Sequence, residues 1–266
     1  MTGSAPTTAV ILTMPRSGSS LLAGVIHALG VPMGEEDGLR RGTHLNRFGC
    51  FEDQEVQFIS LNILAEAGLL LDLTSRLDVD EDAVASATAR YQRRIRDLVA
   101  RHSGTTWGFK DPGLIYSLPH WHERLENPRY IHLTRSTENA AASLLRTYRP
   151  SMWLPELRAK WSLLRPVNRA RVILGGIRLM ATGRRRRVDR EVFERVIEDG
   201  HQRIRSFLGD TPRLELELGE LVSDSRAAIS RIARFLGLES STAAKDAAAA
   251  FVHPELLRNG GAAFDK

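Results

Sequence analysis

The sequence is poor in the features that secreted and membrane-spanning proteins need. Only one of its 266 residues is a cysteine, Cys50, so no disulfide can form within the chain. Its first apolar run, residues 9–12, is too short for a signal peptide or a membrane span. With 42% hydrophobic and 26% charged residues, the composition is typical of a soluble globular protein. We therefore expect a protein of the reducing cytoplasm.

Lysine is scarce as well. It supplies only four of the 37 basic residues, and this bias toward arginine, with many alanines, indicates a GC-rich bacterial genome. The net charge of +5 is unevenly distributed, because residues 149–190 have a net charge of +10 and the rest of the chain has −5. Since one segment accounts for the positive charge, the total does not indicate a nucleic-acid partner, and we expect none.

Four short stretches predict strands: residues 8–14, 105–109, 129–133 and 214–218. The last alternates Leu and Glu, which is typical of an edge strand. Amphipathic patterns predict helices at residues 21–29, 55–67, 81–101, 118–125, 137–148, 190–208 and 226–236. Strands that alternate with helices predict a mostly parallel central sheet with helices on both faces. The length fits a single α/β domain over residues 1–266.

The loop after the first predicted strand has the composition of an anion-binding site. Residues 15–20 read PRSGSS, and such small residues let successive backbone N–H groups point toward a phosphate or sulfate. The next helix adds its N-terminal N–H groups and dipole, and Arg16 adds a permanent charge. The Gly-Lys-Ser/Thr ending of a Walker A loop is missing, so we do not expect ATP–Mg²⁺. Alternatively, residues 15–20 form an ordinary strand-to-helix turn with no binding role.

A second pair of polar residues follows the third predicted strand. Arg135 stands at the strand end, and Ser143 follows eight residues later, about two turns along the next helix. An arginine and a hydroxyl so placed can bind a phosphate from two sides, although alone they also fit a surface arginine and a helix serine. Parallel sheets bind ligands at the carboxyl ends of their strands, and Pro15, Lys110 and Arg135 each follow such an end. We therefore expect them to converge on one edge.

The two motifs in this order resemble those of the sulfotransferases that use 3′-phosphoadenosine 5′-phosphosulfate (PAPS). In that family a P-[KR]-S-G-[ST]-[ST] loop holds the 5′-phosphosulfate, and an Arg-x₇-Ser pair holds the 3′-phosphate. Residues 46–53 (NRFGCFED), 110–112 (KDP) and 221–238 are also similar to stretches of bacterial and tyrosylprotein sulfotransferases. The resemblance spans most of the chain except residues 149–190. It implies a P-loop-NTPase-like three-layer fold.

This resemblance implies transfer of a sulfuryl group from PAPS to a hydroxyl or amine of a small-molecule, glycan or lipid acceptor. The product nucleotide would be 3′-phosphoadenosine 5′-phosphate (PAP). Arg16 would stabilise the leaving 5′-phosphate, and Lys110 would contact the transferring sulfuryl group. No metal is expected, because these cations and backbone N–H groups can neutralise the charge. The residues implied to bind the nucleotide are Arg16, Ser17, Gly18, Ser19, Ser20, Arg135, Ser143 and, from a weaker Arg-x-Gly match, Arg258.

The general base stays open between two carboxylates. Glu36 lies in a GEE stretch similar to that of tyrosylprotein sulfotransferases, whose second glutamate is the base, but its spacing from the loop arginine differs by one residue. Glu52 lies in the FE pair of the bacterial stretch. His44 is a third candidate, because the cytosolic branch of the family uses a histidine. Each of the three could instead be an ordinary surface residue with a solvated side chain and no catalytic role.

The basic segment 149–190 has three interpretations. It combines Trp153, Trp161 and the apolar run 172–177 with many arginines. The first interpretation is a helical insertion that caps the acceptor site, with its arginines in water. The second is a lid that recognises an anionic acceptor, such as a glycan or a phospholipid head group. The third is a peripheral membrane helix with arginines on one face and apolar residues on the other.

Two other functions stay open. A small-molecule or nucleotide kinase on the same core is opposed by the missing Walker lysine. A non-catalytic module that binds a nucleotide or an anionic lipid is opposed by the complete set of Arg16, Lys110, Arg135 and Ser143.

Overall fold

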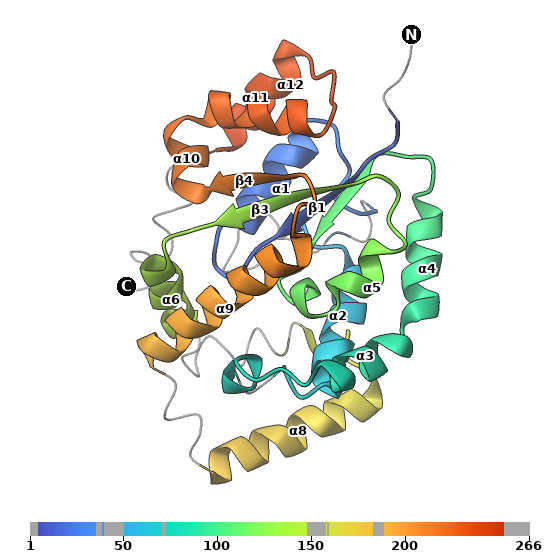
Figure 1. Cartoon of the computed structure of the whole chain (residues 1–266), viewed down its shortest axis with the longest axis vertical. Helices are drawn as coiled ribbons and strands as arrows, with labels where there is room; N and C mark the ends of the chain where they lie inside the picture. Colours follow the sequence, from blue (N-terminus) through green and yellow to red (C-terminus); the bar gives the residue numbers. More distant parts are fainter. Residues whose placement is uncertain are drawn as a thin grey trace.

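The computed structural model describes residues 5–35, 39, 51–70, 73–147, 158, 160–182 and 189–252. Its centre is a sheet of four parallel strands: β1 (Thr8–Leu12), β2 (Trp107–Lys110), β3 (Pro128–Thr134) and β4 (Arg213–Glu217). They lie in the order β2-β1-β3-β4 (Figure 1). All four predicted strands are confirmed, and β4 lies at an edge, as its alternation of Leu and Glu predicts.

Two layers of helices cover the sheet, because successive side chains of a strand point to opposite faces. Ala9 and Ile11 of β1 belong to the core on one face, and Val10 and Leu12 belong to the core on the other. The first layer consists of α1 (Ser19–Ala28), α10 (Leu218–Ser223), α11 (Ser225–Phe235) and α12 (Thr242–Phe251). The second consists of α2 (Gln54–Glu66), α3 (Glu81–Ala89), α4 (Gln92–Arg101), α5 (Leu118–His122), α6 (Thr137–Thr147), α9 (Arg190–Leu208) and the 3₁₀ helices η2 (Leu73–Arg76) and η3 (Leu114–Tyr116). The predicted three-layer α/β fold is confirmed.

One long helix of the basic segment, α8 (Pro166–Ala181), lies outside the second layer and packs against α2 (Figure 1). Leu61 and Ala65 of α2 form a small core there with Leu164 and Val172. The predicted helical character of the basic segment is thus confirmed for α8, whereas residues 149–157, 159 and 183–188 lie outside the described residues. Within the described residues, no helix has the length and apolar character needed to cross a membrane.

The predicted helix at residues 81–101 needs correction, because it is divided into α3 and α4. The N–H groups of Arg90 and Tyr91 donate to carbonyl oxygens three residues earlier, which ends the regular α-helical pattern. The break turns Tyr91 into the core, where it is 2% exposed, and its hydroxyl donates to Glu66 Oε1 at 2.7 Å.

Helix α12 is a structural feature that the sequence patterns do not predict. Its alanine-rich sequence has little apolar periodicity, so tertiary packing and capping stabilise it instead. The hydroxyl of Ser241 accepts a hydrogen bond from the N–H of Ala244 at 3.1 Å. Phe251 lies so close to Gly24 of α1 that a side chain at position 24 has no room.

A buried histidine pair joins α9 to β3 near the carboxyl ends of the strands. His132 Nε2 and His201 Nδ1 are 2.9 Å apart, and Glu215 Oε2 of β4 lies 2.8 Å from His132 Nδ1. Burial lowers the pKa of His132. Burial also lowers the pKa of His201, and the neighbouring His132 lowers it further, to about 4. We therefore expect His201 to be neutral near pH 7. The pair fixes β3 three residues before Arg135.

Candidate functional site

The loop that joins β1 to α1 has two residues in the left-handed region of backbone space. Gly18 has φ +87°, which favours glycine, and a Cβ atom there would lie 2.5 Å from Leu218 Cδ1, so a side chain would require Leu218 to move. Arg16 has φ +68°, a conformation that costs free energy in a residue with a side chain. Gly18 has no side chain to cap α1, which leaves the first N–H groups of this helix available to an anion.

Ser17, the residue between them, is fully buried. Its hydroxyl has no hydrogen-bond partner among the described residues. Leaving a buried hydroxyl unsatisfied costs about 1–3 kcal/mol, so such a group in a folded protein calls for a partner. An anion bound in the loop would supply an acceptor for this hydroxyl. The loop therefore fits the phosphate or sulfate group that its sequence predicts.

Lys110 is the last residue of β2, and its side chain is only 2% exposed. Its ammonium group lies against the loop, because Nζ donates to Ser19 Oγ at 3.3 Å and to Ser20 Oγ at 3.1 Å. The same Nζ forms an ion pair with Glu52 Oε1 at 2.7 Å. Three separate parts of the chain thus meet around one buried cation.

Glu52 is the carboxylate that faces this cation, and it is 8% exposed. Its position follows from the start of α2, where Asp53 caps the helix by accepting from the N–H groups of Glu55 and Val56 at 2.8 and 3.0 Å. The second oxygen of Glu52 accepts a hydrogen bond from the side-chain amide of Gln57. The carboxylate is therefore held by a cation on one side and an amide on the other.

A second carboxylate, Asp111, follows Lys110 in the chain. Burial raises the pKa of Asp111, and the nearby charge of Glu52 raises it further. Asp111 Oδ1 accepts from Ser60 Oγ at 2.6 Å and from the N–H of Gly113 at 2.7 Å, contacts that favour the charged form. Asp111 therefore fixes the turn after β2 against α2.

Arg16, Ser143 and Arg135 form the other half of the site. Arg16 Nε donates to Ser143 Oγ at 3.0 Å, and Ser143 is 2% exposed on α6. Arg135, one residue beyond β3, donates from a terminal guanidinium nitrogen to the backbone oxygen of Arg16 at 3.0 Å. Burial and the neighbouring Arg146 lower the pKa of Arg135. The expected convergence of Arg135, Lys110 and the loop on one edge of the sheet is therefore present.

Three predicted site residues, Glu36, His44 and Arg258, lie outside the described residues. The described residue before Glu36 is Glu35, which lies near the start of α2. Its N–H donates to Asp53 Oδ2 at 3.4 Å. The side chain of Glu35 forms an exposed ion pair with Arg101 at 3.3 Å.

Gln57 and Ser60 contact the two acidic residues of the site, but no sequence pattern singles them out. Both are polar, and both are buried on α2 among apolar residues. That unusual position is the signal that points to them, although it appears only once the buried face of the helix is known.

The described residues contain no group of three or more His, Cys, Asp and Glu side chains that could hold a metal ion. The site instead contains three cations, Arg16, Lys110 and Arg135. It also contains the uncapped N-terminus of α1 and the hydroxyls of Ser17, Ser19 and Ser20. This donor set is suited to anionic oxygen atoms.

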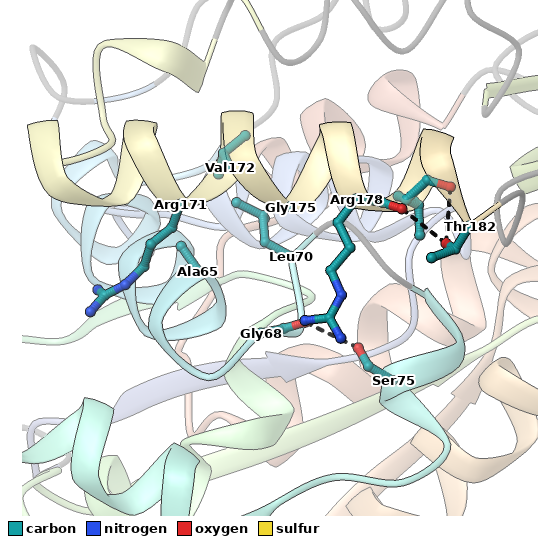
Figure 2. A pocket seen from close by; sticks show the side chains of 10 residues that line it. Ala65, Gly68, Leu70, Ser75, Arg171, Val172, Gly175, Arg178 and Thr182 are labelled. Atoms are coloured by element: carbon teal, nitrogen blue, oxygen red, sulfur yellow. Dashed lines mark hydrogen bonds between the residues drawn. The ribbon is translucent and has the colours of Figure 1, made fainter.

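A cavity of about 590 Å³ lies at the opposite end of α2, between α2, η2 and α8 (Figure 2). Its wall combines apolar residues such as Ala65 and Val172 with Arg171 and Arg178. Twelve helical residues, about 18 Å, separate Asp53 from Ala65, so this cavity is distinct from the loop site.

A family model and several solved structures are similar to this chain. A family model described as "Sulfotransferase family" matches residues 8–242. The sulfotransferase domain from the curacin biosynthetic pathway is 18% identical, with 90% of this chain and 76% of that chain covered and a TM-score of 0.49. The sulfotransferase domain from the Synechococcus PCC 7002 olefin synthase is 20% identical, with 96% and 83% covered and a TM-score of 0.45. Retinol dehydratase, solved in complex with androsterone and inactive cofactor PAP, is 14% identical, with 96% and 66% covered and a TM-score of 0.41. No curated protein matches the chain.

Proposed function

The chain belongs to the sulfotransferase family, and on this premise we propose that it transfers a sulfuryl group from PAPS to a hydroxyl or amine and releases PAP. The observation that supports the PAPS donor best is the meeting of Arg16, Lys110 and Arg135 around the N-terminus of α1. PAPS presents anionic groups at both ends of its ribose, and cations from separate strands suit such a ligand. The proposed acceptor is a small molecule, a glycan or a lipid, and the proposed location is the cytoplasm.

In this proposal the loop binds the 5′-phosphosulfate, and Arg135 and Ser143 bind the 3′-phosphate. Ser143 is already hydrogen-bonded to Arg16, whose backbone oxygen accepts from Arg135. The two anion sites are thus joined through one residue. Binding of the whole nucleotide would then orient its 5′ end against Lys110, which contacts Ser19 and Ser20 of the same loop.

Catalysis would consist mainly of positioning and charge neutralisation. A bond forms between the acceptor oxygen or nitrogen and sulfur, and the bond between sulfur and the bridging phosphate oxygen breaks. Arg16 and Lys110 would neutralise the charge that develops on the leaving phosphate. Removing one such contact typically lowers the rate by roughly 10²–10³-fold.

We propose Glu52 as the group that accepts the proton of the acceptor. It is the candidate carboxylate whose contacts are described, and it lies 2.7 Å from Lys110. An anion bound in the loop competes with Glu52 for this lysine, and a weaker ion pair raises the proton affinity of a carboxylate. Donor binding would therefore prepare the base. Glu36 stays the alternative.

Thermal unfolding with matched nucleotides tests the donor site. PAP should stabilise the protein, by about 2.7 kcal/mol at a concentration 100 times its dissociation constant. Adenosine 5′-phosphate lacks the 3′-phosphate and should stabilise it less, and ATP–Mg²⁺ should have little effect. Stabilisation by ATP–Mg²⁺ but not by PAP would favour a kinase and contradict the proposal.

Incubation of the protein with labelled PAPS and a cell extract tests for turnover. A labelled product that requires the active protein supports the enzyme and identifies the acceptor. Stabilisation by PAP without turnover of PAPS, in extracts and with added acceptors, would instead indicate a non-catalytic binding module.

A further inference from the structure

Helix α8 exposes an apolar face to solvent. In the described part of the chain, every large apolar side chain with high exposure lies on this helix: Val167 (49%), Ile173 (52%), Leu174 (66%), Ile177 (54%) and Met180 (66%). At 100° per residue these five side chains fall within an arc of about 140°. The opposite face holds the helix to the protein, because Asn168 and Val172 are buried there. An apolar arc of this width indicates a surface that a partner covers.

Positive charge borders this arc. Arg169 lies beside one edge of the arc, and Arg171 and Arg178 lie beside the other, at positions set by the helical repeat. Arg178 lines the cavity, and its side chain extends from α8 toward Gly68 and Ser75, as Figure 2 shows. No acidic residue occurs between Glu156 and Asp189 in the sequence, and four further arginines, residues 184–187, follow the helix. The sequence around the apolar arc is therefore cationic without an acid, although Arg169 also donates to the carbonyl oxygens of Trp161 and Leu164, and Arg171 donates to Asn168 Oδ1.

One acid of α2 has its side chain buried beneath the helix. Glu66 of α2 has a side chain that is 3% exposed, forms an ion pair with Arg90 at 2.7 Å and lies 4.0 Å from Arg171. Burial opposes ionisation of Glu66, but hydrogen bonds from Tyr91, Asn168 and Arg90 leave its pKa lowered. Glu66 lies within 4.0 Å of three arginines, Arg90, Arg165 and Arg171, so this one acid leaves a net positive charge beside α8.

We propose that α8 docks the protein on a lipid bilayer that contains anionic lipids. The apolar arc would enter the boundary between head groups and acyl chains, and the arginines would contact the lipid phosphates. A second copy of this chain fits less well, because two α8 helices packed face to face would bring arginine borders together without an acid between them. The helix would lie on the membrane surface rather than cross the bilayer. This proposal is independent of the reaction at the sheet edge.

Vesicle flotation tests the proposal without any nucleotide. The full chain is mixed with vesicles of phosphatidylcholine alone, or of phosphatidylcholine with phosphatidylglycerol, at roughly 0.05 M and 0.5 M salt. We expect binding to the anionic vesicles that weakens as salt increases. The double variant Leu174→Ser/Ile177→Ser should lower this binding by about tenfold or more, because it removes apolar side chains from the interface. Arg178→Gln should lower it by about fivefold.

Two matched variants serve as controls. Gly176→Ser adds the same side chain outside the arc, where a Cβ atom meets nothing within 4 Å. Arg234→Gln removes an exposed arginine from α11, on the other side of the sheet (Figure 1). Both should bind as the parent does, and all variants should unfold at the same temperature as the parent.

Three results would overturn the proposal. The first is a parent protein that does not float with anionic vesicles at low salt. The second is a Leu174→Ser/Ile177→Ser variant that floats as well as the parent, which would place the membrane contact elsewhere. The third is a parent dimer, measured by light scattering, that becomes a monomer in this double variant while the parent ignores vesicles. That result would assign the face to a second copy.

Discussion

The carboxyl edge of the sheet and helix α8 are both basic, but their cations are organised differently. At the edge, Arg16, Lys110 and Arg135 come from three distant parts of the chain, and each contacts a fixed partner. Lys110 is 2% exposed, whereas Arg178 of α8 is exposed at the wall of the cavity. A small anion needs cations fixed at set distances, while an extended surface needs only charge density. The edge is therefore suited to a small ligand and α8 to a surface.

This difference has an electrostatic consequence. At 0.1 M salt the screening length is about 10 Å, so interactions between exposed charges farther apart than this are largely screened. Interactions between buried charges are screened much less. Vesicle binding through α8 should therefore weaken strongly with salt, and the ion pair between Lys110 and Glu52 should not.

Replacing Lys110 should have the largest effect. Lys110→Met leaves Glu52 buried without its cation, so the free energy of unfolding should fall by about 3 kcal/mol. Turnover of PAPS should fall by roughly 10³-fold. The double variant Lys110→Met/Glu52→Gln should recover part of the stability but none of the turnover. Chemical denaturation and a sulfation assay measure the two effects, and an unchanged stability in Lys110→Met would show that the ion pair does not form.

Arg16→Ala should lower turnover by roughly 10²–10³-fold, with a smaller loss of PAP affinity, because the charge acts mainly on the leaving phosphate. Two further variants separate the charge from the backbone. Arg16→Gly relieves the left-handed strain at φ +68° but should be as inactive as Arg16→Ala. Arg16→Lys retains the charge and should retain most of the turnover. Equal turnover in Arg16→Ala and the parent would remove this residue from the proposed mechanism.

The edge should also respond to acid, whereas α8 contains no residue that titrates between pH 4 and 7. Burial lowers the pKa of His201 from 6.5 to about 4, so the unfolded chain binds a proton in this range that the folded protein does not. This contribution to stability is complete above pH 6.5 and is lost as the pH falls toward 4, up to about 3 kcal/mol. Urea unfolding across this range should show a smaller pH dependence in His201→Gln than in the parent. An equal pH dependence would contradict the neutral, buried histidine.

Ser143→Ala tests the half of the site that would bind the 3′-phosphate. The variant should bind PAP about tenfold more weakly, because a hydrogen bond to a charged group is lost. Its affinity for adenosine 5′-phosphate, which lacks this phosphate, should be unchanged. Ser230→Ala on α11 is a matched control, since that hydroxyl donates to a helix carbonyl oxygen on the exposed surface. Calorimetry with the two nucleotides measures the difference, and equal losses for both would contradict the assignment.

The sequence predicts the edge of the sheet well because its signals are local. Apolar runs define β1, β2 and β3; a small-residue loop follows β1, Lys110 is the last residue of β2, and Arg135 follows β3. Parallel pairing then dictates that these ends meet, whatever the helices do. The contact between Arg16 and Ser143 is not predictable in this way, because it joins the loop to α6, 127 residues further along the chain.

The orientation of helices is the part that the sequence leaves undetermined. Gln57 and Ser60 are significant only because their face of α2 is buried beside Glu52 and Asp111. For α8 the apolar periodicity would equally suit a helix that faces the core. Only the tertiary position shows that Leu174 and Ile177 face solvent. Tertiary burial thus decides which polar residues belong to a site and which apolar residues form a surface.

Two substitutions, two residues apart on α8, should have the smallest effects and test this orientation directly. Val172 is 5% exposed and Leu174 is 66% exposed. Val172→Ala should lower the free energy of unfolding by about 1 kcal/mol, because it leaves a small cavity against α2. Leu174→Ala should change it by less than about 0.5 kcal/mol, although it removes the larger side chain. If chemical denaturation gives the reverse order, the apolar arc faces the protein, and α8 has no apolar surface to offer a bilayer.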